Sequence, residues 1–218
     1  MQKNLWSVLI FIALTLFPFV MCSQKGKENT DNATIEINAK LAEEQAAFAR
    51  LKAKADTAKV FCKAKEFDLQ HCILIDFSIH SGKNRFYVWD FENDTIKYQS
   101  LCCHGYGQES TQSKPVFSNV EGSYCSSLGK YKIGARSYSN WGINVHYKMH
   151  GLDKTNNNSF KRWIVLHSHT PVPSHEIHPQ HLPLGWSQGC PVINDDIMRK
   201  VDALLKATKK PMLLWVYN

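Results

Sequence analysis

Seven cysteines occur in the 218 residues, but no two of them have the C-x-x-C spacing. Zinc ribbons and thioredoxin-type redox motifs depend on that spacing, so the sequence argues against both. Five cysteines remain once Cys22 and Cys190 are set aside for the reasons given below: Cys62, Cys72, Cys102, Cys103 and Cys125. We interpret the five mainly as buried residues, with one disulfide pair as the alternative, and expect Cys102 and Cys103 on opposite faces of a strand.

Acidic residues are almost absent from the region richest in histidine. Five histidines lie between His167 and His181, and Glu176 is the only acidic residue among them. Prolines interrupt this stretch, so it cannot form the helix on which zincins place two histidine ligands. We interpret these histidines as solvated loop residues and predict neither a metal site nor a cofactor. The alternative is a metal bound by His167 and His169 from one face of a strand.

The N-terminal apolar run is too short to span a membrane. It follows Lys3, extends from Leu5 to Phe17, and has the length of a secretory signal peptide. The first polar step then coincides with Cys22, which resembles a bacterial lipoprotein cleavage site, although Met21 is larger than the residue usual there. We predict a signal peptide over residues 1–22, secretion across the inner membrane, and a periplasmic or cell-envelope location. Lipidation at Cys22, ordinary cleavage and an uncleaved anchor remain alternatives.

Length and periodicity predict one globular domain with an N-terminal appendage. Residues 24–34 are polar, which is typical of a tether. Apolar residues then recur at spacings of three, four and seven, which predicts an amphipathic helix: Ile37, Leu41, Phe48, Leu51, Ala55, Ala58 and Cys62. We expect this helix to pack on the domain, with a spacer or partner helix as the alternative. The predicted boundaries are 23–66 for tether and helix and 67–218 for the globular domain.

The remainder of the chain reads mainly as β-strands. Runs rich in β-branched and aromatic residues, separated by turn residues, predict a meander over 73–77, 85–89 and 95–98. Further strands are predicted over 129–133, 143–149, 163–167 and 212–217. One helix is predicted near the C-terminus, with Asn194 or Asp195 as its N-cap and Pro211 just beyond its end.

A cysteine on a tight turn is the best candidate for catalysis. Gly189 and Pro191 flank Cys190, and glycine and proline together favour a turn that exposes the thiol. A histidine, His167, ends the apolar run before it and can take the proton of the thiol. The predicted helix after Cys190 adds a positive dipole end that would lower the pKa of the thiol. Buried, inert roles for both residues are the alternative.

These residues resemble a known family. Residues 162–167, followed by Ser187-Gln188-Gly189-Cys190, resemble the signature of L,D-transpeptidase catalytic domains, and most closely the murein L,D-transpeptidase catalytic domain branch. Further matching fragments extend the resemblance over roughly residues 70–218: Asp76-Phe77-Ser78, Arg85-Phe86-Tyr87-Val88, Cys103-His104-Gly105, Phe117-Ser118-Asn119 and Ser127-Leu128-Gly129-Lys130-Tyr131. The resemblance implies a mainly β fold, an L,D-transpeptidase-like β-sandwich with a helix after the catalytic cysteine, preceded here by the amphipathic helix.

The resemblance also implies a reaction and its residues. Cys190 would form a thioester with a peptidoglycan stem that loses its terminal D-alanine, and His167 would act as the base. The carbonyl group of Ser168 would orient the imidazole, and Ser187 would support the turn. The acceptor would be a side-chain amine of a neighbouring stem, or water in a carboxypeptidase. From the turn geometry we add the backbone N–H groups of Gly189 and Cys190 as candidates for the oxyanion hole.

Substrate binding is assigned more loosely. Arg162 and Arg136 are candidates for binding a carboxylate, because a guanidinium can bind it bidentately; surface salt bridges are the alternative. By resemblance, His104 would form a wall of the cleft, with a structural hydrogen-bonded role as the alternative. Gln188 stands where the broader family has histidine, the gap between His167 and Cys190 is longer than in that family, and the arginine often found after the cysteine is absent.

Charge and residue order decide among the remaining classes. The net charge of +7 suits an anionic partner such as wall-peptide carboxylates or a membrane surface, and the secretion signal argues against nucleic acid. Papain-like and related wall peptidases place cysteine before histidine, whereas here His167 precedes Cys190. A metal-dependent amidase and a non-catalytic peptidoglycan-binding lipoprotein remain alternatives, the latter because of Gln188.

Overall fold

The computed structural model describes the chain from Met21 to Asn218, with side chains from Thr34 onward. Residues 1–20 of the predicted signal peptide, and the side chain of Cys22, lie outside the described residues. Within the described range, no helix is both long and apolar enough to cross a membrane. The chain divides into two compact units, residues 1–49 and residues 50–218.

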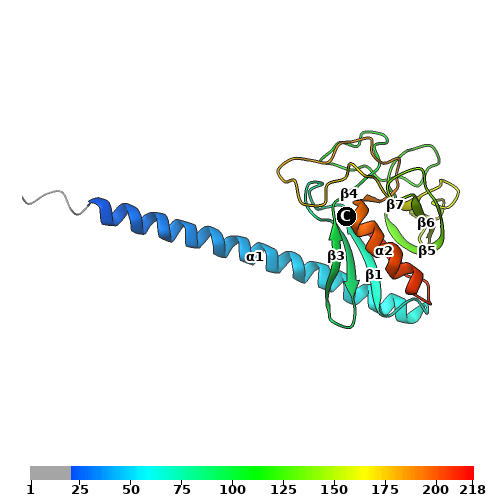
Figure 1. The fold of residues 1–218 in the computed structure, drawn as a ribbon, viewed down its shortest axis with the longest axis horizontal. Helices are drawn as coiled ribbons and strands as arrows, with labels where there is room; N and C mark the ends of the chain where they lie inside the picture. Colours follow the sequence, from blue (N-terminus) through cyan, green and yellow to red (C-terminus); the bar gives the residue numbers. More distant parts are fainter. Residues whose placement is uncertain (1–20) are drawn as a thin grey trace, which may run out of the picture. The chain divides into compact units, whose positions relative to one another are not determined.

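The first helix, α1, extends from Met21 to Ala64 and belongs partly to each unit (Figure 1). The tether predicted for residues 24–34 is therefore helical, which is consistent with the lack of proline there. In the first unit the apolar residues of the helix are exposed: Ile37, Leu41 and Phe48. In the second unit the last part of the predicted stripe is buried: Leu51, Ala55, Ala58 and Cys62. Packing on the sheet is thus confirmed for the part of the helix after Arg50.

Nine strands form one hydrogen-bonded sheet in the second unit. Their bounds are β1 His71–Asp76, β2 Phe86–Asp90, β3 Thr95–Ser100, β4 Cys102–Cys103, β5 Gly129–Tyr138, β6 Val145–Gly151, β7 Val165–Ser168, β8 Val192–Ile193 and β9 Leu213–Tyr217. Their order across the sheet is β3-β2-β1-β9-β5-β6-β7-β8-β4. Neighbouring strands are antiparallel except in the pairs β1–β9 and β7–β8.

The two edges of this sheet must come close together. The edge strand β3 ends at Ser100 and the opposite edge strand, β4, begins at Cys102, so only Leu101 separates them. Arg85 bonds to both edges: its backbone N–H donates to the carbonyl oxygen of Ser100, and its side-chain Nε donates to that of Cys102 at 2.7 Å. The sheet is therefore curled into a nearly closed barrel. The mainly β fold is confirmed, with one continuous curled sheet forming both layers.

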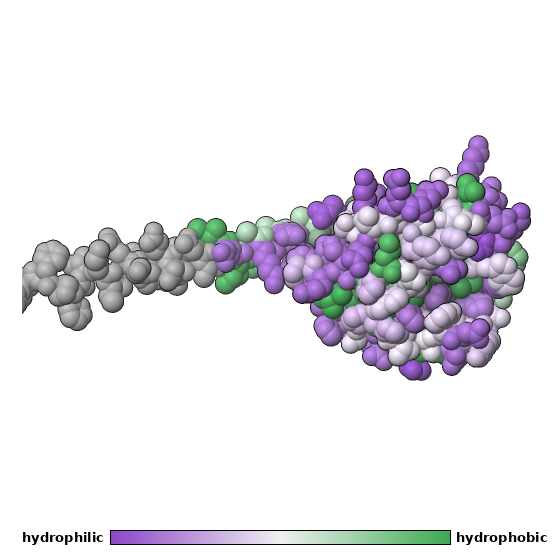
Figure 2. All heavy atoms as spheres, turned by 90° about the horizontal axis from the view of Figure 1, so that it is seen from above, coloured by the Kyte–Doolittle hydropathy of each residue, from purple (hydrophilic) through white to green (hydrophobic). Residues whose placement is uncertain are grey.

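Both faces of the central strands are covered. On β1, Ile73 and Ile75 face the inner core, whereas Cys72 and Leu74 belong to a second cluster with the buried end of α1. This double burial explains the continuous apolar pattern of that strand. On the face of the second unit seen in Figure 2, hydrophilic side chains predominate and hydrophobic ones are scattered.

Every strand predicted from the sequence overlaps an observed one, and the meander of β1, β2 and β3 is confirmed. The strand expected at Cys102 and Cys103 is β4, whereas the two-residue strand β8 was not predicted, because two residues carry no periodicity. Cys102 packs in the inner core and Cys103 in a third cluster, as expected for opposite faces of a strand. All five cysteines of this group are free and buried, so the disulfide alternative is wrong.

The helix after the cysteine, α2, extends from Asp195 to Ala207. Asn194 is its N-cap, with Oδ1 accepting from the N–H of Asp196 at 2.8 Å and from that of Ile197 at 3.3 Å. Met198 and Val201 bury the apolar face of the helix in the inner core. The predicted helix and its N-cap are therefore confirmed, and Figure 1 shows α2 in orange beside the strands.

Candidate active site

Cys190 lies on a turn that only glycine can make. Gly189 has a φ of +110°, and a Cβ there would lie 2.6 Å from the carbonyl oxygen of Cys125. Ser187 closes the turn, because its Oγ accepts from the N–H of Gly189 at 3.0 Å and donates to the carbonyl oxygen of Cys190 at 2.6 Å. The sequence around the cysteine therefore fixes the direction of its side chain.

A second segment, residues 105–127, holds this turn from outside. Ser126 Oγ donates to the carbonyl oxygen of Gly189 at 3.3 Å and accepts from the N–H of Gly105 at 3.0 Å. The N–H of Tyr106 donates to the carbonyl oxygen of Ser187 at 3.1 Å. The turn is thus supported on both sides.

The thiol occupies a break in the β7–β8 ladder. Along β7, the N–H of His167 donates to the carbonyl oxygen of Pro191, and that of His169 donates to Ile193. The next N–H in this series, that of Val165, donates instead to the Sγ of Cys190 at 3.4 Å. The glycine turn has redirected the backbone, and the sulfur takes the position of the missing acceptor.

The electrostatic surroundings of the thiol differ from the prediction. Burial raises the pKa of Cys190 above its usual value of 9.0, against smaller lowering effects of the Val165 N–H and the Arg162 charge. The predicted lowering of the pKa by the α2 dipole is wrong. Residues 191–194 separate the thiol from α2, and the Asn194 side chain already caps the first N–H groups of that helix.

His167 is a buried, neutral imidazole. Its Nδ1 lies 2.9 Å from the carbonyl oxygen of Ser168, which can only accept, so Nδ1 carries the proton and Nε2 is left with its lone pair. Burial lowers the pKa of His167 below 6.5. The imidazole is therefore ready to accept a proton on Nε2.

The imidazole and the thiol belong to the same face of the sheet. Leu166 points into the inner core, so its neighbours on β7 point to the opposite face. Val192, the ladder partner of His167, belongs to the cluster against which Cys190 packs. Val165, which contacts the sulfur, precedes His167 by two residues, or about 7 Å along the strand.

A pocket of about 240 Å³ opens beside the thiol. Its lining residues are Glu121, Gly122, Tyr124, Lys161, Arg162, Trp163, Gln188 and Cys190. The structure thus brings Arg162 and Gln188 to the cysteine, as well as His167 with Ser168 on the neighbouring strand.

Arg162 is held by the protein itself. Its Nη1 donates to Ser118 O at 2.8 Å and Ser127 Oγ at 2.6 Å, and its Nη2 donates to Ser123 Oγ at 3.2 Å and Cys125 O at 2.7 Å. These acceptors are neutral, and among the described residues no carboxylate pairs with this guanidinium. The surface salt bridge weighed as the alternative for Arg162 is therefore wrong, and carboxylate binding by Arg162 stays a prediction. Its positive charge nevertheless remains at the pocket.

Two other predicted binding residues lie elsewhere. His104 is 5% exposed, and its Nδ1 and Nε2 are bonded to Arg85 Nη2 at 2.9 Å and to the Thr111 carbonyl oxygen at 2.8 Å. A role for His104 in the cleft wall is wrong, because both nitrogens serve the fold and burial lowers its pKa to about 4. Arg136 pairs with Asp202 of α2 at 2.7 Å and does not line the pocket.

Two aromatic residues of the pocket were not predicted as site residues. Tyr124 and Trp163 have φ values of +53° and +58°, which cost a side chain of this kind about 1–2 kcal/mol each. Trp163 had been placed in a strand, and nothing in its residue type signals left-handed backbone. Lys148 was also not predicted as a site residue. Its Nζ lies 3.5 Å from the centroid of the Trp163 ring.

His146 is a further unpredicted neighbour. It is the ladder partner of His167 on β6, so the two side chains share one face. Its Nε2 is buried and has no hydrogen-bond partner within the described part of the chain. The positive charge that His146 would carry when protonated contributes to the lowered pKa of His167.

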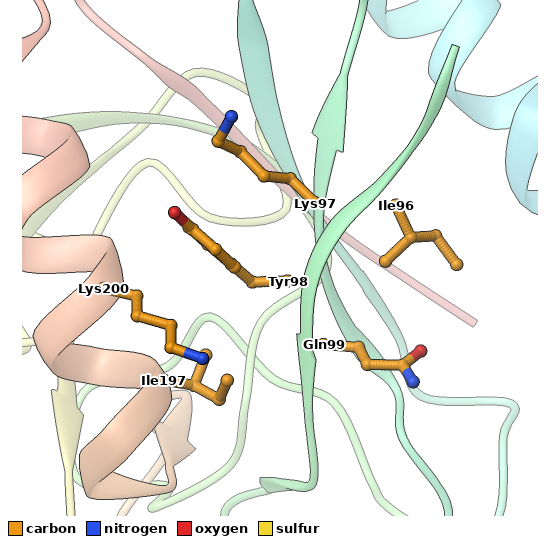
Figure 3. A pocket seen from close by; sticks show the side chains of 6 residues that line it. All are labelled: Ile96, Lys97, Tyr98, Gln99, Ile197 and Lys200. Carbon is orange, nitrogen blue, oxygen red and sulfur yellow. The ribbon is translucent and has the colours of Figure 1, made fainter. Parts of the chain in front are cut away.

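A larger pocket, of about 360 Å³, lies between β3 and α2 (Figure 3). Tyr98 reaches from the strand toward the helix, with Lys97 and Lys200 near its ring. No thiol, imidazole or carboxylate lines this pocket. It therefore lacks a cysteine–histidine pair, whereas the smaller pocket is lined by Cys190.

Histidines of the proline-rich loop gather with His80 rather than with the thiol. His80 stacks on His181 with ring centroids 3.7 Å apart and meets His178 edge to face. Across the described residues, no group of three or more His, Cys, Asp or Glu side chains is arranged to hold a metal ion. The metal alternative therefore gains no support from this cluster.

Comparison with known proteins gives one family. The family model described as L,D-transpeptidase catalytic domain matches residues 43–217. No curated protein matches the chain. The match covers most of the chain, including α1 after Glu43, every strand and the Cys190 turn.

Solved structures resemble the chain more distantly. The helical cell shape determining protein Pgp2 from Campylobacter jejuni is 11% identical over 68% of this chain and 47% of that one, with a TM-score of 0.44. Bd1075 from Bdellovibrio bacteriovorus is 17% identical over 69% and 49%, with a TM-score of 0.40. An L,D-transpeptidase from Xylanimonas cellulosilytica is 10% identical over 67% and 60%, with a TM-score of 0.37. The chain spans about half the length of the first two.

Proposed function

The chain belongs to the L,D-transpeptidase catalytic domain family, whose members act on peptidoglycan peptide stems, and we propose that it is a cysteine-dependent transpeptidase that cross-links such stems. The observation that carries this proposal is the position of Cys190. Its sulfur lies at a break in the ladder, on a turn that requires glycine, at the mouth of a pocket, and on the sheet face of a neutral His167.

The first half-reaction begins with a neutral thiol and a neutral imidazole. His167 Nε2 takes the thiol proton as the sulfur attacks the carbonyl carbon before the terminal D-alanine of the donor stem. The C–S bond forms, the C–N bond breaks, and the same proton passes from the imidazolium to the departing amine. Ser168 fixes the imidazole throughout, because its carbonyl oxygen stays bonded to Nδ1–H.

The oxyanion requires a different set of donors from the one expected. The N–H of Gly189 is already bonded to Ser187 Oγ, so it is not free to bind the oxyanion. We assign that role to the N–H of Cys190 together with the positive charge of Arg162, which lines the same pocket. Ser187 then acts by holding the turn, and Gln188 by lining the pocket.

In the second half-reaction a side-chain amine of a neighbouring stem attacks the carbonyl carbon of the thioester. The C–N bond forms, the C–S bond breaks, and His167 passes the proton of the amine to the departing sulfur. Water in place of the amine would make the protein an L,D-carboxypeptidase. A non-catalytic peptidoglycan-binding lipoprotein is the remaining candidate, motivated by Gln188 where the broader family has histidine.

The location follows from this substrate. Peptidoglycan lies outside the inner membrane, so we propose secretion by the signal peptide at residues 1–22 to the periplasm or cell envelope. Attachment through a lipid at Cys22 remains part of this proposal, with cleavage and an uncleaved anchor as its alternatives. Labelling of cells with a radioactive fatty acid, with Cys22→Ala as control, tests the anchor.

The activity is tested with the full-length protein and a disaccharide tetrapeptide. We expect release of D-alanine, a cross-linked dimer, and a mass increase on the peptide that contains Cys190. Cys190→Ala should give none of these. Cys62→Ala, which removes a buried thiol of α1, should retain all three. A wild-type protein that binds the tetrapeptide but forms neither adduct nor product would replace this proposal with the binding function.

A further inference from the structure

Tyr124 and Trp163 share three properties that no other pair of residues in the pocket has. Both line the pocket of Cys190, both are aromatic and substantially exposed, at 46% and 70%, and both have left-handed backbone. Aromatic side chains rarely adopt that conformation, and strain of this kind accumulates at functional sites.

Burial in the core does not offset this strain. Neither ring belongs to a core cluster. Tyr124 stacks on Tyr106, with ring centroids 5.3 Å apart, and Trp163 carries the ammonium group of Lys148 on its face. Each ring is thus held in place from outside the core.

The side chain of Arg162, the residue before Trp163, holds the backbone on both sides of Tyr124. Arg162 directly precedes Trp163, and its Nη2 donates to the carbonyl oxygen of Cys125, which directly follows Tyr124. A second bond from Nη2, to Ser123 Oγ at 3.2 Å, reaches the residue before Tyr124. The guanidinium therefore ties the two aromatic residues together across the pocket.

We propose that Tyr124 and Trp163 form an aromatic wall that holds the last two residues of the peptide stem against Cys190; this inference rests on the proposed function. The volume favours the end of the peptide over the sugar. A pocket of about 240 Å³ is smaller than the roughly 300–1,000 Å³ that holds a drug-sized ligand. The sulfur also lines this pocket, so the part of the substrate inside it adjoins the reacting bond.

Charge gives the bound peptide a direction. The terminal residue of the stem has a free carboxylate, and Lys148 places a positive charge at the Trp163 side of the pocket. The Lys161 ammonium, in contrast, is paired with Glu121 at 2.8 Å. The carboxylate end therefore lies toward Trp163.

The test measures stem affinity and melting temperature separately. Removing rings that serve binding should lower the affinity and raise the melting temperature, whereas removing rings that serve the fold should lower the melting temperature. Asparagine tolerates left-handed backbone and lacks a ring, so Trp163→Asn and Tyr124→Asn remove the wall and relieve the strain. Each should raise the melting temperature of the full-length protein by about 2–4 °C, the shift that relief of such strain gives in a protein of this size. Each should also weaken stem binding about ten-fold, the loss of one aromatic anchor.

Binding is measured by calorimetry on full-length Cys190→Ala protein with two probes, the disaccharide tetrapeptide and the free tetrapeptide. Both probes should lose affinity equally. The matched control is Gln108→Asn, at a left-handed residue outside the pocket, which should raise the melting temperature and leave affinity unchanged.

Three outcomes overturn the inference: unchanged affinity in both wall variants, a lowered melting temperature in them, or a loss of affinity for the sugar-bearing probe alone. Absence of tetrapeptide binding by the Cys190→Ala protein also overturns it. Because no turnover is measured, wall variants that lose affinity support the inference even if the wild-type protein proves unable to transfer the stem.

Discussion

Cys190 precedes β8, and Cys102 and Cys103 lie on β4, the strand that pairs with β8. The two segments differ in the regularity of their backbone hydrogen bonding. Cys102 and Cys103 form β4, whose register with Ile193 and Val192 of β8 is regular. The thiol of Cys190, two residues before β8, instead occupies a position where the ladder fails. The regular strand buries both of its thiols, whereas the interrupted one leaves its thiol partly exposed in a pocket.

In the proposed mechanism, access and a neighbouring base, rather than acidity, distinguish Cys190 from the other thiols. Burial raises the pKa of Cys102 to about 12 and raises that of Cys190 as well. What Cys190 has in addition is a neutral imidazole on the same face of the sheet and an open pocket. Substitutions can remove the imidazole and the position of the thiol in the pocket one at a time.

Removing the base should have the largest effect. His167→Ala leaves the thiol in its pocket with a raised pKa and no proton acceptor, so kcat should fall about 10³-fold in the D-alanine release assay. His150→Ala, on the β6 strand and stacked on Phe160, is the matched control and should retain most of the activity. Comparable loss in both variants would contradict the assignment of the base.

Removing the turn should have the next largest effect. In Gly189→Ala the added Cβ would lie 2.6 Å from the Cys125 carbonyl oxygen and the residue would keep an unfavourable φ, so the turn must move. A displacement of about 1 Å at the nucleophile costs on the order of 10² in rate. Gly185 has a φ of +105° and does not line the pocket, and a Cβ there meets nothing within 4 Å, so Gly185→Ala serves as the strain control. Near-normal kcat in Gly189→Ala would mean that the turn does not set the thiol position.

Thiol labelling should reproduce the comparison directly. At pH 8 iodoacetamide should modify Cys190 at least ten times faster than the five buried thiols of the second unit, because modification of a buried thiol requires local opening of the structure. Peptide mass spectrometry over time gives each rate. Equal rates in the native protein would show that the broken ladder confers no special access.

The elements that could be predicted from sequence are those with local signals. Asn194 predicted the start of α2, because the first N–H groups of a helix have no acceptor within the helix and a side chain at the N-cap can supply one. Its Oδ1 accepts from the N–H groups of Asp196 and Ile197. Runs rich in β-branched and aromatic residues, bounded by turn residues, predicted the long strands. The candidate site was predicted from Cys190 between Gly189 and Pro191 and from His167 at the end of an apolar run.

Other features depend on contacts between distant residues and left no local signal. The approach of the sheet edges at Leu101 follows from a nine-strand order that no single segment encodes. The four acceptors of Arg162 come from a loop some 40 residues earlier, so its charge suggested a ligand carboxylate where the fold supplies serine and backbone oxygens. The left-handed Trp163 was assigned to a strand because its residue type favours one.

A pH measurement sharpens the contrast in acidity. Because burial lowers the pKa of His167 below 6.5 and raises that of Cys190 above 9.0, the resting pair is neutral over the interval between these values. Turnover should therefore decline only below pH 6.5, as His167 becomes protonated. Alkylation of Cys190 without substrate should reach half its maximum above pH 9. A plateau of alkylation near neutral pH would instead indicate a resting thiolate–imidazolium pair.

The smallest effect is expected at Arg136, which the sequence suggested as a carboxylate ligand. Its guanidinium pairs with Asp202 on α2, and Lys206 lies 3.1 Å from the same carboxylate. In Arg136→Gln that second cation remains, so Asp202 keeps a partner and the melting temperature should change little. KM for the tetrapeptide should stay at the wild-type value, whereas Trp163→Asn should raise it, because Trp163 lines the Cys190 pocket and Arg136 does not. A higher KM in Arg136→Gln with unchanged stability would restore the role in substrate binding that the sequence suggested and would extend the binding surface toward α2.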